Sequence, residues 1–354
     1  MPHRLSECVM ATPTLRAFRQ LYPEAQITAL IRRHLRPAID DCPWVDRIAS
    51  VRKKIKGVAD RGDGPIKVAA RIASVKFDTA VILPNSFRSA LLTRTARIPR
   101  RVGYDRDGRG GLLTDRLLPR RVQGKYIPLP LRDHYLGLAR YLGAVDPDPA
   151  MQVFTRPRDD ARADELLAGA GYAVGDARPL VLLCPGDAET DARMWLPRRF
   201  GELADLLVKR LGCAVAMSAG PDERAGYDQA RAATTEKFID LPALGVDLTL
   251  LKSIIRRASL VVTGDTGPRQ FAAAMGVPTV SILGPTDDTW SITHSPRDRV
   301  VAAEAYCRPC GKKKCPLKHT PDDHICMKRV EVEAVFAQAA ELLATGRQPA
   351  ASRA

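Results

Sequence analysis

The segment of residues 260–286 carries the most chemical information in this chain, and it reads LVVTGDTGPRQFAAAMGVPTVSILGPT. An apolar strand-like run leads into Gly-Asp-Thr-Gly at 264–267, a helix is expected to open at about Pro268, and a second strand follows. Glycines let the backbone approach a ligand closely, and a helix start offers free N–H groups to a diphosphate. Asp265 could accept hydrogen bonds from sugar hydroxyls, although an aspartate at such a place is more often a helix N-cap or a turn residue.

A second cluster that could do chemistry follows the apolar run at 180–184 and reads CPGDAETDARMWLP. Pro185 and Gly186 turn the chain, and Arg193 then precedes a helix predicted after Pro197. An arginine in this loop could form a charge-assisted pair with a phosphate, which contributes about 1.5–3 kcal/mol when it is desolvated. A lone arginine in a loop is more often simply solvated.

Four cysteines near the carboxyl end form the pattern C-x2-C-x4-C-x10-C: Cys307, Cys310, Cys315 and Cys326. Such a set, with His319 and His324 between the last two cysteines, is compatible with tetrahedral structural zinc in a loop of low apolar content. Free or redox-labile thiols and an iron–sulfur cluster are the alternatives that the spacing leaves open. The segment does not resemble an open site with three ligands and a carboxylate neighbour, so we expect no cofactor in catalysis.

Short apolar runs alternate with helical patterns along the chain, and this alternation indicates βαβ units with mostly parallel sheets. Strands are predicted at residues 27–31, 47–51, 79–83, 101–103, 180–184, 213–217, 260–263 and 279–283. Helices are predicted at 13–21, 86–96, 198–211 and 332–345, with Thr12 as the N-cap of the first. Ligands of such sheets bind beyond the carboxyl ends of the strands. The segments that follow the predicted strands 180–184 and 260–263 both lie at such ends.

The predicted fold class is therefore α/β, with two doubly wound, Rossmann-like domains that face a central cleft. A stretch at about 144–179 that is rich in Asp, Pro, Gly and Arg separates the halves, and we place the domain hinge there. We expect an N-terminal domain at 1–160 and a C-terminal domain at 175–330. A helix at 331–346 could pack back on the N-terminal domain, and the tail at 347–354 is expected to be disordered.

The net charge of +15 over 354 residues implies an anionic partner, which could be nucleic acid, anionic lipid or a phosphorylated substrate. A generally basic, soluble surface is the alternative. An aromatic content of 5% is low for a protein that stacks on single-stranded nucleic acid. No apolar run approaches the roughly 20 residues needed to cross a bilayer, and no apolar signal segment follows Met1, so we expect a cytoplasmic protein.

Taken together, these motifs resemble glycosyltransferase family 9, the lipopolysaccharide heptosyltransferases. The second half is similar through PGD with Arg193 ahead of MWLP, through GDTGPRQFAAAMGVPTVSILGPT and through the cysteine segment. The first half is similar through CVMATPTLRAFR, FDTAVILPNSFRSALL and RIPRRVGYDRDGRGGLLT, so the resemblance covers nearly the whole chain.

The resemblance implies a GT-B fold and an inverting transfer of a heptose or related sugar that requires no metal. The implied partners are an ADP-sugar donor and an anionic glycolipid acceptor, the lipopolysaccharide inner core or similar, at the inner face of the inner membrane. The basic surface would then hold the protein at that membrane. No nucleic acid is expected as a partner.

Site residues follow from the same resemblance, position by position. Donor contacts would come from Gly186, Arg193, Asp265, Thr266, Gly267 and Gln270. Arg193 stands where the family usually has a lysine, which keeps the positive charge, and Gln270 stands where a histidine is common. Acceptor contacts would come from Asn85, Ser86, Arg88 and Arg101, with Arg100 and Arg106 beside them.

The amino terminus departs from the family pattern. Ser6 and Glu7 occupy the positions of a Gly-Asp pair whose aspartate is the family's proposed catalytic base, and only five residues precede them. Most of the first strand is therefore missing, through a late start codon or loss of part of the acceptor domain. Glu7 is the candidate base, but its extra methylene matters because an error of about 1 Å can cost on the order of 100-fold in rate. An ordinary exposed glutamate near a frayed terminus is the alternative.

Two rival functions stay open at this stage. A catalytically impaired GT-B homologue would keep the donor fold for binding or regulation, as the departures at Glu7 and Gln270 suggest. A basic nucleic-acid-binding protein with a zinc module would instead bind nucleic acid with a steep salt dependence. Saturable binding of a nucleotide diphosphate sugar distinguishes the transferase from the second rival.

Overall fold

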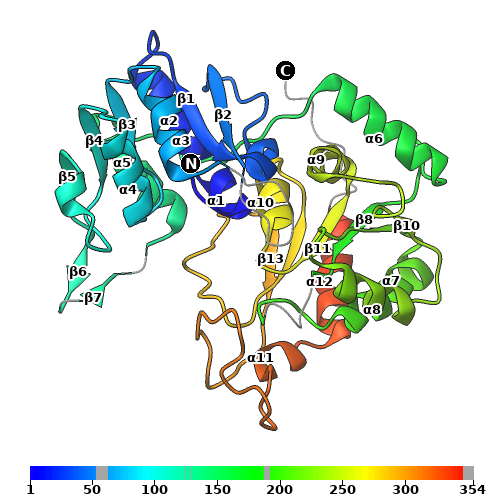
Figure 1. Ribbon diagram of the computed structural model, residues 1–354. Helices are drawn as coiled ribbons and strands as arrows, with labels where there is room; N and C mark the ends of the chain where they lie inside the picture. Colours follow the sequence, from blue (N-terminus) through cyan, green and yellow to red (C-terminus); the bar gives the residue numbers. More distant parts are fainter. Residues whose placement is uncertain (53–62, 124, 128, 187–191, 346–354) are drawn as a thin grey trace. The chain divides into compact units, whose positions relative to one another are not determined.

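The computed structural model describes residues 1–52, 63–123, 125–127, 129–186 and 192–345. The chain divides into two compact units, Met1–Phe154 and Thr155–Ala354 (Figure 1). This boundary falls inside the 144–179 stretch in which the sequence places the hinge. Each unit is built from parallel strands with helices packed against them, as the alternating pattern predicts, and the fold is GT-B with two Rossmann-like units.

The first unit holds two short parallel sheets and one antiparallel hairpin. Its strands are β1 (Thr28–Arg32) and β2 (Arg47–Val51) in one sheet, β3 (Thr79–Val81), β4 (Arg100–Tyr104) and β5 (Asp115–Leu117) in the other, and β6 (Arg121–Val122) with β7 (Lys125–Tyr126) in the hairpin. Its α-helices are α1 (Leu5–Met10), α2 (Thr12–Leu21), α3 (Pro65–Ala73), α4 (Phe87–Thr95) and α5 (Leu131–Tyr141), with short 3-10 turns at Arg33–Ala38 and Gly110–Leu112.

The start of helix α2 differs from the sequence prediction. Ala11 is its N-cap and Thr12 is already helical, because helix α1 ends only one residue earlier. The Thr12 hydroxyl donates a hydrogen bond of 2.7 Å to the carbonyl of Val9 and accepts one of 3.1 Å from the amide of Gln152. The threonine therefore ties the helix pair to the end of the unit instead of capping α2.

The second unit is a six-stranded parallel sheet in the order β10-β9-β8-β11-β12-β13. The strands are β8 (Leu180–Cys184), β9 (Ala214–Met217), β10 (Ile239–Asp240), β11 (Leu260–Thr263), β12 (Thr279–Ile282) and β13 (Asp298–Val301). The chain moves outward from β8 to β9 and β10 and then returns to the other side of β8 with β11. The strand order thus reverses between β8 and β11, which is the position where open α/β sheets bind ligands.

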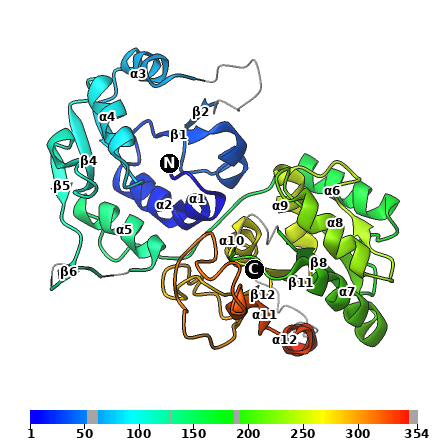
Figure 2. The same cartoon turned by 60° about the horizontal axis from the view of Figure 1, so that its bottom comes forward.

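Seven helices of the described residues belong to this second unit: α6 (Pro157–Gly169), α7 (Pro197–Leu211), α8 (Arg224–Ala233), α9 (Leu248–Arg257), α10 (Gly267–Ala274), α11 (Ile325–Lys328) and α12 (Val332–Thr345). Helices α7 and α8 lie side by side, as do α6 and α9 (Figure 2). Gly201 on α7 allows the first of these contacts, since a β-carbon there would lie 2.4 Å from the carbonyl oxygen of Ala230.

Helix α12 packs on β11, β12, β13 and α7, all within its own unit. Its buried side chains Val335, Ala339 and Leu342 join the core of the six-stranded sheet, together with the fully buried Trp195. These contacts cover the apolar face of α12 with the sheet of its own unit. The expectation that this helix packs back on the N-terminal domain stays a prediction. No helix in the described ranges is both long and apolar enough to span a membrane.

Candidate functional site

The loop between β11 and α10 lies at the carboxyl edge of the sheet, next to the reversal of strand order (Figure 1). Asp265 sits in this loop with a side chain that is 11% exposed. Its Oδ2 accepts a hydrogen bond of 3.3 Å from the hydroxyl of Thr286, and its Oδ1 lies 3.5 Å from Nη1 of Arg269. The carboxylate is thus oriented by two neighbours, and only a small part of it faces solvent.

The amino end of α10 is not capped by a side chain. Thr266 is the N-cap residue, but its hydroxyl pairs at 2.7 Å with the hydroxyl of Thr263 and makes no capping bond. Gly267 and Pro268 open the helix. The first N–H groups of the helix therefore point out of the sheet edge without a side-chain partner, with the positive end of the helix dipole behind them, which suits a diphosphate.

Gly186 and Arg193, from the loop after β8, come together with the β11 loop. Gly186 has φ +66°, and a β-carbon on it would lie 2.5 Å from the sulfur of Met194. A β-carbon on Gly264 would lie 3.3 Å from the main-chain oxygen of Arg193. Met194 thus lies against both glycines: Gly186 makes room for it within the loop after β8, and Gly264 lets the β11 loop approach that loop closely. The structure therefore brings both sequence-predicted donor clusters to one place.

Arg269 is a functional residue that sequence reasoning missed. It is 1% exposed and forms the centre of a polar network below the loop: Nε donates to Ser281 Oγ at 2.8 Å, and Nη2 pairs with Asp298 Oδ2 at 2.9 Å. Nη1 donates to the main-chain and side-chain oxygens of Ser291 at 3.1 and 3.0 Å. The arginine links α10 to β12, β13 and the 291 loop, and it holds Asp265 from below. Its only sequence signal is the GDTGPR order, where an arginine directly follows the helix start.

Gln270 lies next to this network and is completely buried. Its Nε2 donates to the carbonyl of Ser291 at 3.4 Å, and its Oε1 has no hydrogen-bond partner among the described residues. The side chain therefore supports the loop from behind in this structure. Its contact with the donor stays a prediction.

In the first unit, the predicted acceptor residue Asn85 already uses both ends of its amide. Oδ1 accepts from Arg109 Nη2 at 3.0 Å, and Nδ2 lies 3.0 Å from His134 Nε2. Arg109 is fully buried and also donates to the carbonyls of Tyr104 and Pro84. Asn85 is thus held in place at the carboxyl end of β3 by two partners, and its half-buried side chain keeps a second N–H and a second lone pair. Its contact with the acceptor stays a prediction.

His134 and Arg109 are charged or titratable groups that the sequence did not single out. Burial, together with the charges of Arg106 and Arg109, lowers the pKa of His134 to about 4, so the imidazole is neutral at pH 7 and able to accept from Asn85. Its ring stacks on Tyr104 with 3.9 Å between centroids. Burial lowers the pKa of Arg109 to about 10. The network joins the loop after β3 to β4 and α5.

The other predicted acceptor residues differ in their availability. Arg88 is exposed at the start of α4, and Ser86 is the partly exposed N-cap of the same helix, without a side-chain capping bond. The guanidinium of Arg101 instead donates hydrogen bonds to main-chain carbonyls, from Nε to Leu112 at 2.8 Å and from Nη1 to Ile98 at 2.5 Å. Ser86 and Arg88 are therefore the more available of the predicted acceptor residues. Arg101 uses Nε and Nη1 to join two turns, and its contact with the acceptor stays a prediction.

Glu7 lies on helix α1, in place of the tight turn expected for a Gly-Asp pair. Its side chain is 24% exposed, with Oε1 3.9 Å from Arg4 Nε and Oε2 accepting from the amide of His3 at 3.4 Å. Burial, and then the charge of Glu7, raises the pKa of Tyr135. The carboxylate is accessible to a proton donor, which its proposed role as base requires.

The cysteine segment contacts the chain next to both loops of the candidate site. The amide of Ala192 donates to the carbonyl of Lys313 at 2.8 Å, and the amide of Gly311 donates to that of Pro285 at 2.7 Å. Arg308 Nε donates to Gly284 at 2.8 Å. The segment therefore supports the main chain on both sides of the candidate site.

Within this segment, ligand atoms of Cys315, Asp323 and His324 all lie within 4.8 Å of one another. Among the described residues, these three side chains are close enough together to bind one metal ion. The four cysteines do not lie this close to one another. Burial and then the thiols of Cys307, Cys310 and Cys315 raise the pKa of Cys326 to about 11. Zinc at the four cysteines stays a prediction.

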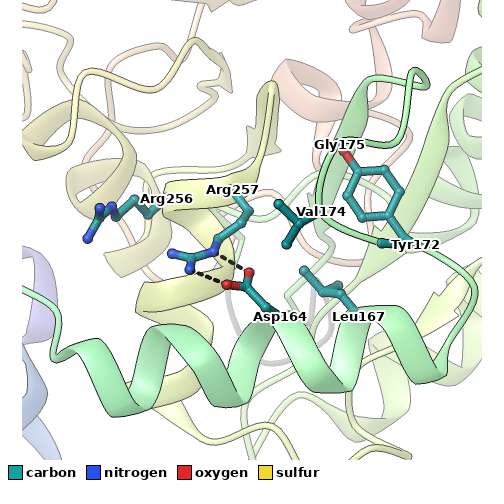
Figure 3. A pocket seen from close by; sticks show the side chains of 8 residues that line it. Asp164, Leu167, Tyr172, Val174, Gly175, Arg256 and Arg257 are labelled. Carbon is teal, nitrogen blue, oxygen red and sulfur yellow. Dashed lines mark hydrogen bonds and ion pairs between the residues drawn. The ribbon is translucent and has the colours of Figure 1, made fainter.

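A pocket of about 370 Å³ lies away from these loops, between α6, α9 and the turn that follows α6 (Figure 3). Its two arginines are already paired: Arg257 Nε with Asp164 at 2.7 Å and Arg256 Nη1 with Asp160 at 2.8 Å. None of the sequence-predicted site residues lines it. We assign it to the packing of α6 on α9.

The sequence model of glycosyltransferase family 9 (heptosyltransferase) matches residues 66–320, which is well over half of the chain. The chain belongs to glycosyltransferase family 9. It is a glycosyltransferase, and Arg193, Asp265, Thr266 and Gly267 lie inside the matched range, whereas Glu7 lies outside it.

Known members of glycosyltransferase family 9 resemble the chain over most of its length. Lipopolysaccharide heptosyltransferase 2 of Salmonella typhimurium is 26% identical over 314 residues, covering 85% of this chain and 86% of that protein. The Escherichia coli protein of the same name is 26% identical over 313 residues, with the same coverage. The crystal structure of E. coli ADP-heptose lps heptosyltransferase II superposes with a TM-score of 0.75 at 22% identity, over 97% of each chain.

Proposed function

We propose that this glycosyltransferase moves a heptose, or a closely related sugar, from an ADP-sugar to the lipopolysaccharide inner core or a similar anionic glycolipid. The curated relatives are named for heptose transfer to lipopolysaccharide or lipooligosaccharide, and a solved neighbour is named for ADP-heptose. We place the reaction at the cytoplasmic face of the inner membrane, because the net charge of +15 favours an anionic surface.

One observation supports the donor half of this proposal: the loop after β8 packs on the β11 loop, through Arg193 and Met194 against Gly264, at the reversal of strand order. The backbone of Arg193 therefore lies beside the loop that carries Asp265 and leads into the uncapped start of α10. A cation and free N–H groups suit the diphosphate, and the oriented carboxylate suits sugar hydroxyls.

In the proposed mechanism, the acceptor hydroxyl oxygen attacks the anomeric carbon while the bond to the diphosphate oxygen breaks on the opposite face. The configuration inverts, and ADP leaves with the bonding electron pair. Its growing negative charge is stabilised by Arg193 and by the amino end of α10. Glu7 takes the proton of the hydroxyl as general base, and no metal ion takes part.

Calorimetric titration with ADP-, GDP- and UDP-sugars tests the donor site. We expect saturable binding of an ADP-sugar, loss of binding in Asp265→Ala, and at least tenfold weaker binding in Arg193→Ala, because a charge-assisted bond to phosphate is worth about 1.5–3 kcal/mol. Arg198→Ala is the matched control: its side chain is 80% exposed on α7 and pairs with Glu202. Failure of every nucleotide sugar to bind would reject the proposal.

The same titration separates the two rival functions. A catalytically impaired homologue would bind the donor but transfer nothing, and the helical position of Glu7 is the observation in its favour. Transfer by the unaltered chain and its loss in Glu7→Gln would exclude this rival. A nucleic-acid-binding protein would ignore the sugar nucleotides and bind oligonucleotides with a steep salt dependence.

We further propose that Cys307, Cys310, Cys315 and Cys326 hold one structural zinc ion. The residue types suit zinc, because four cysteines in a loop of low apolar content are a common zinc ligand set and a bound cation favours their thiolate forms. Zinc would supply no step of the reaction and would only fix the loop that supports Gly284 and Ala192. The rival set is Cys315, Asp323 and His324.

Elemental analysis of the purified protein tests this site. We expect one zinc per chain, lost in Cys307→Ser and retained in Asp323→Asn. The reverse pattern would assign the ion to the rival set, and iron in place of zinc would indicate a different centre. Absence of any metal from protein purified without chelator would reject the site.

A further inference from the structure

The segment from β5 to β7 exposes several apolar side chains close together in the chain. Leu118 is 79% exposed, Val122 is 59% exposed and Tyr126 is 36% exposed. All three lie on or directly before the β6–β7 hairpin, which Figures 1 and 2 both show at the edge of the first unit. Isolated exposed apolar residues are normal, but three within nine residues (118–126) form a local apolar tip.

Arginines surround this tip. Arg116, Arg120 and Arg121 are exposed, and neither Arg116 nor Arg120 has an acidic partner in the described residues. The nearest acidic residue in the sequence, Asp115, is already paired with Arg100 at 3.0 Å. The positive charge of the hairpin is therefore not balanced locally.

Tyr126 fixes two of the positive charges in place. The guanidinium carbon of Arg121 lies 4.4 Å from the centroid of its ring, and that of Arg106 lies 4.1 Å from it. Arg121 Nη2 also donates to the tyrosine hydroxyl at 2.6 Å. Arg106 Nε is buried and has no hydrogen-bond partner in the described part of the chain. An aromatic ring between two cations, one with an unused donor, is a surface arranged for anions.

We propose that the β6–β7 hairpin, defined as residues 116–126, is the element that docks this enzyme on an anionic lipid bilayer. The arginines contact lipid phosphates, and Leu118 and Val122 enter the boundary between headgroups and acyl chains. Exposed aliphatic side chains favour a bilayer over nucleic acid, because aliphatic groups gain nothing from phosphates alone and stack poorly on bases.

Docking by this hairpin deepens the proposed function and rests on it. Arg106 follows β4 and belongs to the same carboxyl edge as the loop that holds Ser86 and Arg88. A bilayer bound at the hairpin would therefore present its lipids next to the predicted acceptor contacts, so the membrane would deliver the glycolipid to the residues that bind it.

Co-sedimentation with vesicles tests the docking surface without donor or acceptor. The vesicles contain phosphatidylglycerol and phosphatidylcholine in equal amounts, and pure phosphatidylcholine vesicles serve as the neutral probe. Arg120→Gln/Arg121→Gln should lower the partition coefficient roughly 20-fold, at about fivefold for each cation lost. Leu118→Ser/Val122→Ser should lower it at least about tenfold.

Two control variants match these changes elsewhere on the protein. Arg158→Gln/Arg162→Gln removes the same charge from α6, where both side chains are more than half exposed. Val145→Ser removes an aliphatic side chain that is 93% exposed in the first unit. Both should bind vesicles within about twofold of the parent chain, and circular dichroism checks that every variant is folded.

The outcomes decide the proposal. Selective loss in the two hairpin variants supports it. Equal loss in the α6 control would assign binding to the overall net charge and overturn it, as would equal binding to neutral vesicles or unchanged binding in both hairpin variants. Titration with an ADP-sugar in detergent is a separate measurement, so failure of docking is distinguished from failure of the donor site.

Discussion

The guanidinium of Arg269 and the carboxylate of Asp298 form a buried ion pair, with 2.9 Å between Nη2 and Oδ2 and side chains that are 1% and 4% exposed. Ser281 and Thr293 donate further hydrogen bonds to the same carboxylate, at 2.5 and 2.7 Å. Every charged atom of the pair is thus satisfied by the protein. The pair connects the helix that opens the donor loop with the edge strand β13.

Removing one partner of this pair should destabilise the protein strongly. Arg269→Met leaves a buried carboxylate without its cation, so we expect the free energy of unfolding to fall by about 3–5 kcal/mol. Urea denaturation measures the change. The exposed pair of Arg224 and Asp228 is the control, with side chains 67% and 51% exposed, and Arg224→Met should cost less than about 1 kcal/mol. Equal costs at the two sites would contradict the network.

Gly186→Ala should distort the donor loop. The substitution meets both a positive φ and the sulfur of Met194, whereas Gly171→Ala meets a positive φ of +87° with open space around it. We expect the control to cost about 1–2 kcal/mol of stability and to leave donor affinity unchanged. Gly186→Ala should also weaken ADP-sugar binding at least tenfold by calorimetry. Recovery of affinity in Gly186→Ala/Met194→Ala would show that the contact with Met194 is the cause.

His134 should make the stability of the protein depend on pH in mildly acidic solution. Its pKa is lowered from 6.5 to about 4 in the folded state, so the unfolded chain binds the proton more readily. The stabilisation is fully present above pH 6.5 and is lost as the pH falls toward 4, with a total on the order of 3 kcal/mol. Urea denaturation between these pH values measures the slope.

Two histidine variants isolate that effect from the carboxylates. His134→Gln keeps a hydrogen-bond acceptor for Asn85 but cannot titrate, so the pH slope should flatten. His319→Gln changes an exposed histidine and should leave the slope as it was. An unchanged slope in His134→Gln would mean that the buried imidazole does not control it.

The cysteines should differ sharply in their reaction with iodoacetamide. Burial raises the pKa of Cys8 and Cys184 to about 12, and that of Cys42 to about 11, so these core thiols should react only on unfolding. Cys307, Cys310 and Cys315 are partly exposed and should react in the folded chain after chelator treatment. Mass spectrometry of the labelled peptides measures the order. Protection of these three thiols without chelator is the expected sign of a bound ion.

Several elements could be predicted from local sequence because local forces decide them. The runs at 180–184 and 260–263 coincide with β8 and β11, and the pattern at 332–345 coincides with α12. Continuous apolar runs bounded by turn residues have few alternatives to a buried parallel strand. The candidate donor loop was predictable for the same reason, since glycines and a helix start mark it directly.

Side-chain partners were harder to predict. Asn85, Arg101 and Gln270 were predicted to contact ligands, and each also makes a hydrogen bond within the protein to a group 11 to 49 residues away in the chain. Arg269 was overlooked because its partners at 281, 291 and 298 adjoin it only in the folded unit. A polar residue type shows that a hydrogen bond must be made, but not with what.

The sequence by itself thus determined the α/β class, the alternation of elements and the position of the glycine-rich candidate loop, because periodicity and glycine placement act over a few residues. Its motifs also carried the resemblance to the family. Only the tertiary structure decided which polar side chains stay available to a ligand and which belong to the interior. It also decided that α12 covers its own sheet and that the β6–β7 hairpin exposes an apolar tip among arginines. The physical reason is that burial and hydrogen-bond pairing depend on neighbours brought together by folding.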